Sequence, residues 1–431
     1  MMTAWEKFQI GEFVFEREGK YKPHHEAIVG LQRIDKIDFD GNFHLSGKPS
    51  KTGMILIKPR DLVISGINVS KGALGVYQGD EDVSATIHYS SYTFDEKKID
   101  VDYFRYFVKS ESFLDLLEKQ VGGGIKTEIK PRHFLSLTIS LPNKSEQEEI
   151  VKKFRRIEKE YAKLQIAIEQ QRALVSNLRQ MILDMAVRGK LVPQNPKSEP
   201  AAVLLEKIKA ERQKQERAGK VSANPLPSLT DEEKSFTIPV GWEWARLGEV
   251  LIYDAGINVT PGQLKGEKWL LELEDIEKNT SRLLQKIKVK ERSAKSHKSE
   301  FMKGDVLYGK LRPYLNKALV ASEDGYSTTE IVSLRPYCDI VPEYAVVCLK
   351  RSDFHAYVEQ SGQGTKMPRL RKVDAIKASF PLPPLAEQKR IVTKVNKLMA
   401  LCDKLEAQIT DNQNNTNELV KAISRETFPN A

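Results

Sequence analysis

The strongest constraint on the fold of this chain is an internal repeat. Residues 141–154 read LPNKSEQEEIVKKF and residues 382–395 read LPPLAEQKRIVTKV, with seven of fourteen positions identical at an offset of 241 residues. In both copies a proline closes a short apolar run, and proline cannot continue a strand ladder. Glu146 and Glu387 follow, where an acid favours the first turn of a helix. The repeat predicts two copies of a strand that leads into a helix.

Beyond each copy, apolar residues recur with spacings of four and three. This heptad pattern is typical of a coiled-coil seam, and about forty residues of helix extend ~60 Å. Polar residues interrupt both seams at matching places and can fix register. We predict that the two helices pair with each other; the alternative is that each packs on its own globular domain. The predicted seams contain Ile150, Phe154, Ile157, Tyr161, Leu164, Ile168, Gln171, Val175, Leu178 and Ile182, and Ile391, Val395, Leu398, Cys402, Leu405, Ile409, Asn412, Leu419 and Ile423.

The segments before the helices are related more weakly. RDLVISG at 60–66 is similar to KGDVLYG at 303–309, VSATI at 83–87 to YSTTE at 326–330, and GGGIK at 122–126 to GQGTK at 362–366. Short apolar strands, turn residues and short helices alternate in both segments, which predicts two α+β globules. The expected order is globule, helix, globule, helix.

One segment, residues 188–235, has no second copy. Gly189 is a plausible helix stop with a proline soon after it, and a short basic helix is expected to begin at Glu199-Pro200. This segment must carry the chain from the first helix to the second globule.

Charge and cysteine content limit the class of protein. The net charge of +9 favours a polyanionic partner only mildly. Three cysteines without a CxxC pair indicate a reducing compartment. The N-terminal residues are charged throughout, and no apolar run approaches the ~20 residues that span a bilayer. We expect a cytoplasmic protein without membrane contact, and without a metal site, because the pair His24-His25 lacks a third ligand.

Four stretches resemble the DNA specificity subunits of type I restriction-modification systems. They are LRQMILDMAVRGKLVPQNPKSEPAAVLLEKIKAERQ at 178–213, FTIPVGWEWARLGEV at 236–250, GDVLYGKLRPYLNKALV at 304–320 and FPLPPLAEQKRIV at 380–392. We expect no counterpart of the PVGWEW stretch at 239–244 in the first domain.

This resemblance implies two target-recognition domains, residues 1–144 and 236–384, related by a pseudo-two-fold axis. Spacer helices at 145–188 and 385–428 would form an antiparallel coiled coil, with a connector at 189–235. Each domain would read one half of a bipartite double-stranded DNA target. Two methyltransferase subunits and motor-nuclease subunits would be the partners. The chain itself would be non-catalytic and hold no cofactor, while S-adenosylmethionine, ATP and Mg would be bound by the partners.

Basic loops are the candidate DNA contacts, because Arg reads guanine, Asn reads adenine and Lys grips phosphate. The alternative for each loop is a solvated turn. In the second domain the candidates are Lys310, Arg312, Tyr314, Asn316, Lys317, Lys366, Arg369, Arg371 and Lys372. In the first domain they are Ser65, Asn68, Lys71, Lys126, Lys130 and Arg132.

Two other functions compete with DNA reading. A fused methylase-nuclease would need a cofactor loop and an Asp or Asn before the proline pair, where this chain has Leu382. A DNA-binding coiled-coil scaffold outside restriction-modification would explain the seams but leaves the duplicated basic-looped globules unexplained.

Overall fold

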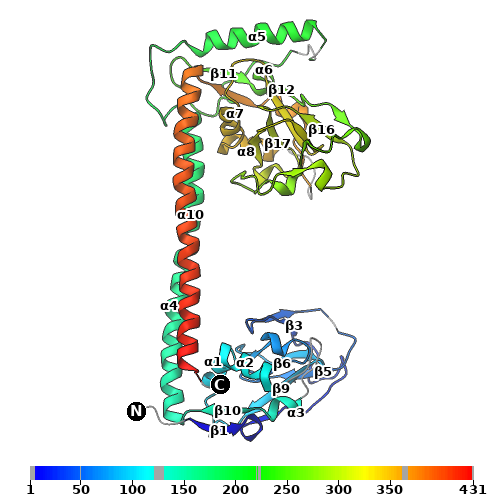
Figure 1. The fold of residues 1–431 in the computed structure, drawn as a ribbon, viewed down its shortest axis with the longest axis vertical. Coiled ribbons are helices and arrows are strands. Elements are labelled where there is room, and N and C mark those ends of the chain that lie inside the picture. The colour runs from blue at the N-terminus through cyan, green and yellow to red at the C-terminus, as the bar shows by residue number, and fades with distance from the viewer. Residues whose placement is uncertain are drawn as a thin grey trace. The chain divides into compact units, whose positions relative to one another are not determined.

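The computed structural model describes residues 5–48, 50–120, 131–219, 221, 225–361 and 367–429. The chain divides into two compact units, one of residues 1–170 with 409–431 and one of residues 171–408. Two long helices, α4 (Lys144–Val187) and α10 (Leu385–Thr427), contribute residues to both units (Figure 1). The predicted mixture of helices and strands is confirmed.

The first unit contains two four-stranded sheets and a strand pair. One sheet has the order β2-β9-β6-β7, the other β4-β3-β8-β5, and β1 pairs with β10. Only the β3–β8 contact is parallel among the strand pairs described in this unit. The bounds are β1 Glu6–Gln9, β2 Val14–Glu16, β3 Arg33–Ile37, β4 Phe43–Ser46, β5 Met54–Ile57, β6 Leu62–Ser65, β7 Leu74–Val76, β8 Val83–Thr86, β9 Tyr89–Phe94, β10 Thr138–Leu141, α1 Val101–Phe107, α2 Glu111–Gln120, α3 Pro131–Leu135, and the 3-10 turns η1 Ile10–Glu12 and η2 Val69–Lys71.

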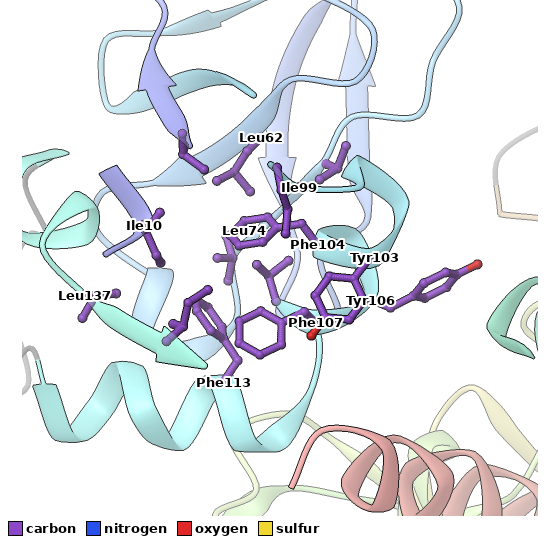
Figure 2. Close-up of a cluster of buried hydrophobic side chains, with 14 of the residues drawn as sticks. Ile10, Leu62, Leu74, Ile99, Tyr103, Phe104, Tyr106, Phe107, Phe113 and Leu137 are labelled. Carbon is purple, nitrogen blue, oxygen red and sulfur yellow. The ribbon is translucent and has the colours of Figure 1, made fainter. Parts of the chain in front are cut away.

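An aromatic core holds the first unit together (Figure 2). Tyr103, Phe104 and Phe107 of α1 pack with Phe113 of α2, and Asp100 caps α1 by accepting from the amides of Asp102 and Tyr103. Phe154 of α4 and Phe428, which directly follows α10, belong to the same core. The core therefore joins the sheet-bearing part of this unit to both long helices.

The second unit has the same plan. Its four-stranded sheet has the order β12-β20-β17-β18, its larger sheet β13-β16-β19-β14-β15, and β11 pairs with β21. The bounds are β11 Glu243–Arg246, β12 Leu251–Tyr253, β13 Asn258–Val259, β14 Trp269–Leu271, β15 Ile287–Lys288, β16 Lys298–Phe301, β17 Val306–Gly309, β18 Ala318–Val320, β19 Gly325–Thr328, β20 Ile331–Pro336, β21 Ser379–Leu382, α5 Ala201–Arg217, α6 Leu247–Val250, α7 Pro342–Leu349, α8 Ser352–Ser361, α9 Lys372–Ala375, and the 3-10 turns η3 Pro261–Gln263, η4 Leu273–Asp275, η5 Val289–Glu291 and η6 Pro313–Leu315.

The strand orders of the two units correspond one to one. Strands β2, β9, β6 and β7 match β12, β20, β17 and β18, while β5, β8, β3 and β4 match β16, β19, β14 and β15. The single parallel contact also recurs, as β3–β8 in one unit and β14–β19 in the other. Strand β13 is the one addition among the described strands. The weak sequence similarity before the helices therefore reflects a duplicated fold.

One sequence-based expectation was wrong: the first unit does contain a counterpart of the Trp242-Glu243 pair. The indole of Trp242 donates to Glu387 at 3.0 Å, and that of Trp5 donates to Glu146 at 3.3 Å. Strand β1 follows Trp5 and pairs with the strand before α4, as β11 does before α10. The counterpart is Trp5-Glu6, and we missed it because it lies at a different offset from the helical repeat.

Helices α4 and α10 run in opposite directions where they touch. In the first unit, Tyr161 donates to Asn417 at 2.8 Å, and Gln413 donates to Gln165 at 3.2 Å. In the second unit, Arg179 donates to Asp403 at 2.6 Å. In each unit, residues of one long helix therefore bond residues of the other.

The predicted seam positions differ in burial. Apart from Ile391, the best-buried positions form one set spaced by multiples of seven residues: Phe154, Ile168, Val175 and Ile182 of α4 and Val395, Cys402 and Ile409 of α10. The positions between them are more open, since Leu164, Leu178, Leu405 and Leu419 are 40–61% exposed and Gln171 and Asn412 are also exposed. Ile391 is buried, while Ile150, Ile157, Tyr161, Leu398 and Ile423 are half-buried.

Helix α4 ends at a glycine cap. The amide of Gly189 donates to Ala186 and that of Lys190 to Met185, which is the bond pattern of a Schellman motif. Gly189 has φ +66°, and a Cβ there would lie 2.3 Å from Cγ of Pro239. The connector then forms α5, whose Ala201, Leu204 and Ile208 are buried. Within the described part of the chain, no helix is both long enough and apolar enough to cross a membrane.

Candidate nucleic-acid interface

The two basic clusters predicted in the second domain lie side by side. The loop between β17 and β18, residues 310–317, is called the β17–β18 loop below. The amide of Arg312 donates to the carbonyl of Pro368 at 2.8 Å, and the amide of Leu370 donates to that of Lys310 at 3.0 Å. An isolated bridge between Leu311 and Arg369 completes the contact. Two segments that are far apart in the sequence thus form one basic surface.

Arg312 sits at the strained start of the β17–β18 loop. Its backbone is left-handed, with φ +50° and ψ +59°, although it precedes Pro313. Such a conformation is costly for a residue with a side chain, and strain of this kind clusters at binding sites. The side chain is exposed and makes no hydrogen bond or ion pair with any residue that the structure describes. Tyr314, two residues on, is 47% exposed.

Asn316 and Lys317, predicted as DNA contacts, point into the protein instead of presenting a free surface. Asn316 is 7% exposed and left-handed, with φ +53°. The ammonium group of Lys317 donates to the carbonyl of Leu273 at 2.7 Å, and desolvation lowers its pKa. Both residues therefore hold the loop against the interior of the domain.

The remaining cations of the surface differ in how far they are neutralised. Arg369 makes an ion pair with Glu330 at 3.0 Å, and Arg371 makes one with Asp374 at 2.7 Å. The hydrogen bond to its carboxylate partner raises the pKa of each guanidinium group. Lys372 is exposed and Lys310 is half-buried. Like Arg312, these two lysines have no carboxylate partner among the described residues.

Three of the first-domain candidates, Ser65, Asn68 and Lys71, lie at the equivalent turn of the duplicated fold. Residues 66–73, called the β6–β7 loop, connect the strands that correspond to β17 and β18. Ser65 ends β6 and is half-buried, as is Asn68, whose carbonyl accepts from the amides of Lys71 and Ala73. Lys71 is exposed, with its ammonium group 5.9 Å from the ring centroid of Phe39. This loop carries fewer cations than its counterpart.

Four predicted contacts have no side-chain description. Lys126, Lys130 and Lys366 lie outside the described residues, and Arg132 is described only by its backbone, in α3. The glycine-rich stretches at 122–126 and 362–366 also lie outside them.

Sequence reasoning missed a second basic surface, on the edge strand β15 and the turn after it. Lys286, Lys288 and Lys290 alternate along the segment KIKVK and are exposed. Lys288 and Lys290 share one carboxylate, Glu267, at 2.9 and 2.8 Å, and these bonds lower the pKa of Glu267 to about 2. The alternation itself was the available signal. Exposed lysines also protect an edge strand from aggregation, so this surface alone does not define a site.

Comparisons with known proteins point to one family. No protein-family model matches the chain. The type I restriction enzyme EcoAI specificity subunit of Escherichia coli is 32% identical over 258 residues, covering 58% of this chain and 44% of the relative. The EcoEI specificity subunit of the same organism is 31% identical over 258 residues, covering 58% and 43%. The match therefore spans less than half the length of either relative.

One solved structure has a similar fold over almost the whole chain. It comes from work on complex assembly and conformational transition of the type I R-M system, and it aligns with a TM-score of 0.57 at 15% identity, covering 99% of this chain and 97% of its own. At this identity the likeness concerns the fold alone. The resemblance that the sequence motifs indicate is confirmed by the curated relatives.

Proposed function

We propose that this chain, a relative of type I restriction enzyme specificity subunits, is the non-catalytic DNA-reading subunit of a type I restriction-modification complex. Each globular domain reads one half of a bipartite double-stranded target. The two long helices form an antiparallel coiled coil that sets the gap between the halves. Adenine methylation and ATP-dependent cleavage belong to partner subunits, which bind S-adenosylmethionine, ATP and Mg.

The observation that carries this proposal is the duplicated fold with unlike loops at one equivalent turn. The β6–β7 and β17–β18 loops connect matching strands, yet one presents Asn68 and Lys71 and the other presents Arg312 and Tyr314. Side chains at base edges determine which bases are recognised, while the rest of the domain determines its position on the DNA. A duplicated frame with different loops suits a target whose two halves differ.

The lengths of the helices support the proposal that they set the gap. Helix α4 has 44 residues and α10 has 43, so each is ~65 Å long at 1.5 Å per residue. Readers that face successive turns of the same groove stand ~34–36 Å apart. Paired helices of this length are stiff enough to fix such a separation.

An apolar stripe on α4 supports docking of the methyltransferase subunits. Leu174, Leu178, Met181 and Met185 are 66, 40, 58 and 37% exposed. Their spacing of four, three and four residues places them on one face of the helix. Contiguous exposed apolar residues on a helix are typical of a surface that receives partner helices.

Methylation mapping tests the proposal. The chain is co-expressed with its methyltransferase subunits in a host that lacks other methylases, and the methylated adenines are mapped across the genome. We expect a two-part motif with a gap of constant length. Exchanging residues 1–140 for the first domain of another specificity subunit should change only one half of this motif. A continuous motif, or a change in both halves, would contradict the proposal.

The same preparation separates the proposal from a scaffold function. The complex should bind its mapped target more tightly than scrambled DNA, and its affinity should fall steeply with salt because phosphate contacts release counterions. Equal affinity for both DNAs would indicate a scaffold that binds DNA without reading it.

A further inference from the structure

Lys350 is a buried lysine without a carboxylate partner. It follows α7 and is 8% exposed, and its ammonium group makes no ion pair with any residue that the structure describes. Instead it donates to the carbonyl of Thr280 and to Oγ of Ser281, both at 3.0 Å. Desolvation and the nearby guanidinium of Arg179 lower its pKa to about 8. Burying an ammonium group without a carboxylate partner costs free energy. The role of the two hydrogen bonds that it makes therefore needs an explanation.

Ser281 links Lys350 to the β17–β18 loop. Its backbone is left-handed, with φ +62°. Its hydroxyl donates to the carbonyl of Asn316 at 2.8 Å and accepts from the amide of Ala318 at 3.0 Å. One residue before Thr280, the amide of Asn279 donates to the carbonyl of Leu315 at 2.9 Å. The far side of the loop therefore rests on residues 279–281.

Backbone strain is concentrated where the β17–β18 loop contacts residues 279–281. Asn279, Ser281, Asn316 and Arg312 all have positive φ, between +50° and +65°, although none is glycine. Such conformations persist only where surrounding bonds hold them. Lys350 supplies two of these bonds, to residues 280 and 281. Ser281 in turn holds Asn316 through the hydrogen bond from its hydroxyl.

Within the second unit, α4 bonds the segment that contains Lys350, and α10 bonds the neighbour of Ser281. Gln180 of α4 donates to the carbonyl of Lys350 at 3.1 Å, and Asp184 accepts from the amide and hydroxyl of Ser352 at 2.9 and 2.6 Å. Arg282, the neighbour of Ser281, makes an ion pair with Asp403 of α10. A continuous set of bonds thus runs from the helices to the reading loop.

We infer that Lys350 and Ser281 are positioning residues for the β17–β18 loop, and that they connect this loop to α4 and α10. The inference rests on the proposed function, because it assigns these residues to base reading by Arg312. Through them, the helices hold Arg312 in the orientation that faces the base edge, and neither residue contacts DNA itself.

Arg351 provides a matched control. It is 2% exposed and adjacent to Lys350, and its guanidinium group bonds Asp353 and the carbonyls of Cys348 and Ser379. None of these described bonds reaches the β17–β18 loop. Arg351→Met therefore removes another buried cation from the same turn without touching the loop.

Hydrogen exchange on the full chain tests the support. In Lys350→Met and in Ser281→Ala, we expect the amides of Asn279, Leu315 and Asn316 to exchange roughly tenfold faster, because the bonds that hold the loop are lost. Arg351→Met should leave these amides as in the parent chain. Loop amides that exchange no faster in Lys350→Met and Ser281→Ala than in Arg351→Met would overturn the inference.

Base preference in the reconstituted methyltransferase tests the function. With DNA randomised over the second half-site, Arg312→Ala should lower discrimination at one position by roughly fivefold or more. Lys350→Met and Ser281→Ala should relax that same position, and Arg351→Met should relax none. If Arg312→Ala relaxes a position and neither support variant does, the inference fails while the proposed function stands. If Arg312→Ala changes no position, the assignment of this loop to base reading fails, and the inference with it.

Discussion

Gln147 and Gln388 make the same pair of hydrogen bonds in the two halves of the chain. Gln147 accepts from the amide of Asp100 at 2.8 Å and donates to the carbonyl of Pro142 at 2.9 Å. Gln388 accepts from the amide of Val341 at 2.9 Å and donates to the carbonyl of Pro383 at 3.0 Å. Each glutamine links the N-cap residue of a domain helix, α1 or α7, to the proline that follows the strand before a long helix.

These glutamines are expected to be stability determinants. Both are almost fully buried, at 2% and 0% exposure, so replacing either with alanine leaves a buried amide and a buried carbonyl without partners. The expected loss is about 1–3 kcal/mol of unfolding free energy for each substitution. Urea denaturation of Gln388→Ala against Gln408→Ala, an exposed glutamine on the same helix, would measure it. Equal midpoints for the two variants would show that these bonds contribute little.

Arg312→Ala should change what is read, not only how tightly the DNA is bound. The exposed guanidinium group lacks a described carboxylate partner and is free to pair with a base. Its loss should cost ~1–3 kcal/mol at one position of the second half-site. Lys372→Ala, from the same surface, should weaken binding to all sequences alike if it contacts phosphate. Competition binding with single-base variants of the mapped target distinguishes the two, and uniform weakening by Arg312→Ala would assign it to phosphate.

Alkaline pH should stabilise the second unit through Lys350. Its pKa is about 8 in the folded chain, below the ordinary lysine value of 10.5, so between these values the unfolded chain binds more protons. Stability then rises with pH across this window, because the burial penalty of the ammonium group disappears as it deprotonates. Denaturation midpoints of the parent and Lys350→Met between pH 7.5 and 10 would show the effect as a rise missing from the variant. Parallel curves would mean that the proton leaves Lys350 at its ordinary pKa.

Lengthening the helices should lengthen the gap. Seven residues inserted at facing positions of α4 and α10 preserve the spacing of the buried residues and add ~10 Å at 1.5 Å per residue. Successive base pairs are ~3.4 Å apart, so the mapped gap should grow by about three base pairs. Methylation mapping provides the measurement. An unchanged gap would show that something other than the helices sets the distance.

The sequence predicted the parts of the fold that depend on local periodicity. Heptad spacing from Ile150 and Ile391 marked both long helices, and Gly189 marked where α4 stops. The contact between residues 310–312 and 368–370 could not be predicted in the same way, since it joins segments far apart in the chain. The burial of Asn316 and Lys317 could not be predicted either, because polar residues in a turn are expected to be exposed. The sequence does not show that this turn packs against Leu273 and Ser281.

Each half of the chain carries its own fastening to the helix that it precedes. Trp5 bonds Glu146 and Trp242 bonds Glu387, without any residue of the opposite half. A genetic crossover inside α4, before Gln180, would therefore transfer the β17–β18 loop together with the α4 residues that hold its support. Under the proposed function, a lineage could replace one half of its target in a single recombination event and keep the other half unaltered.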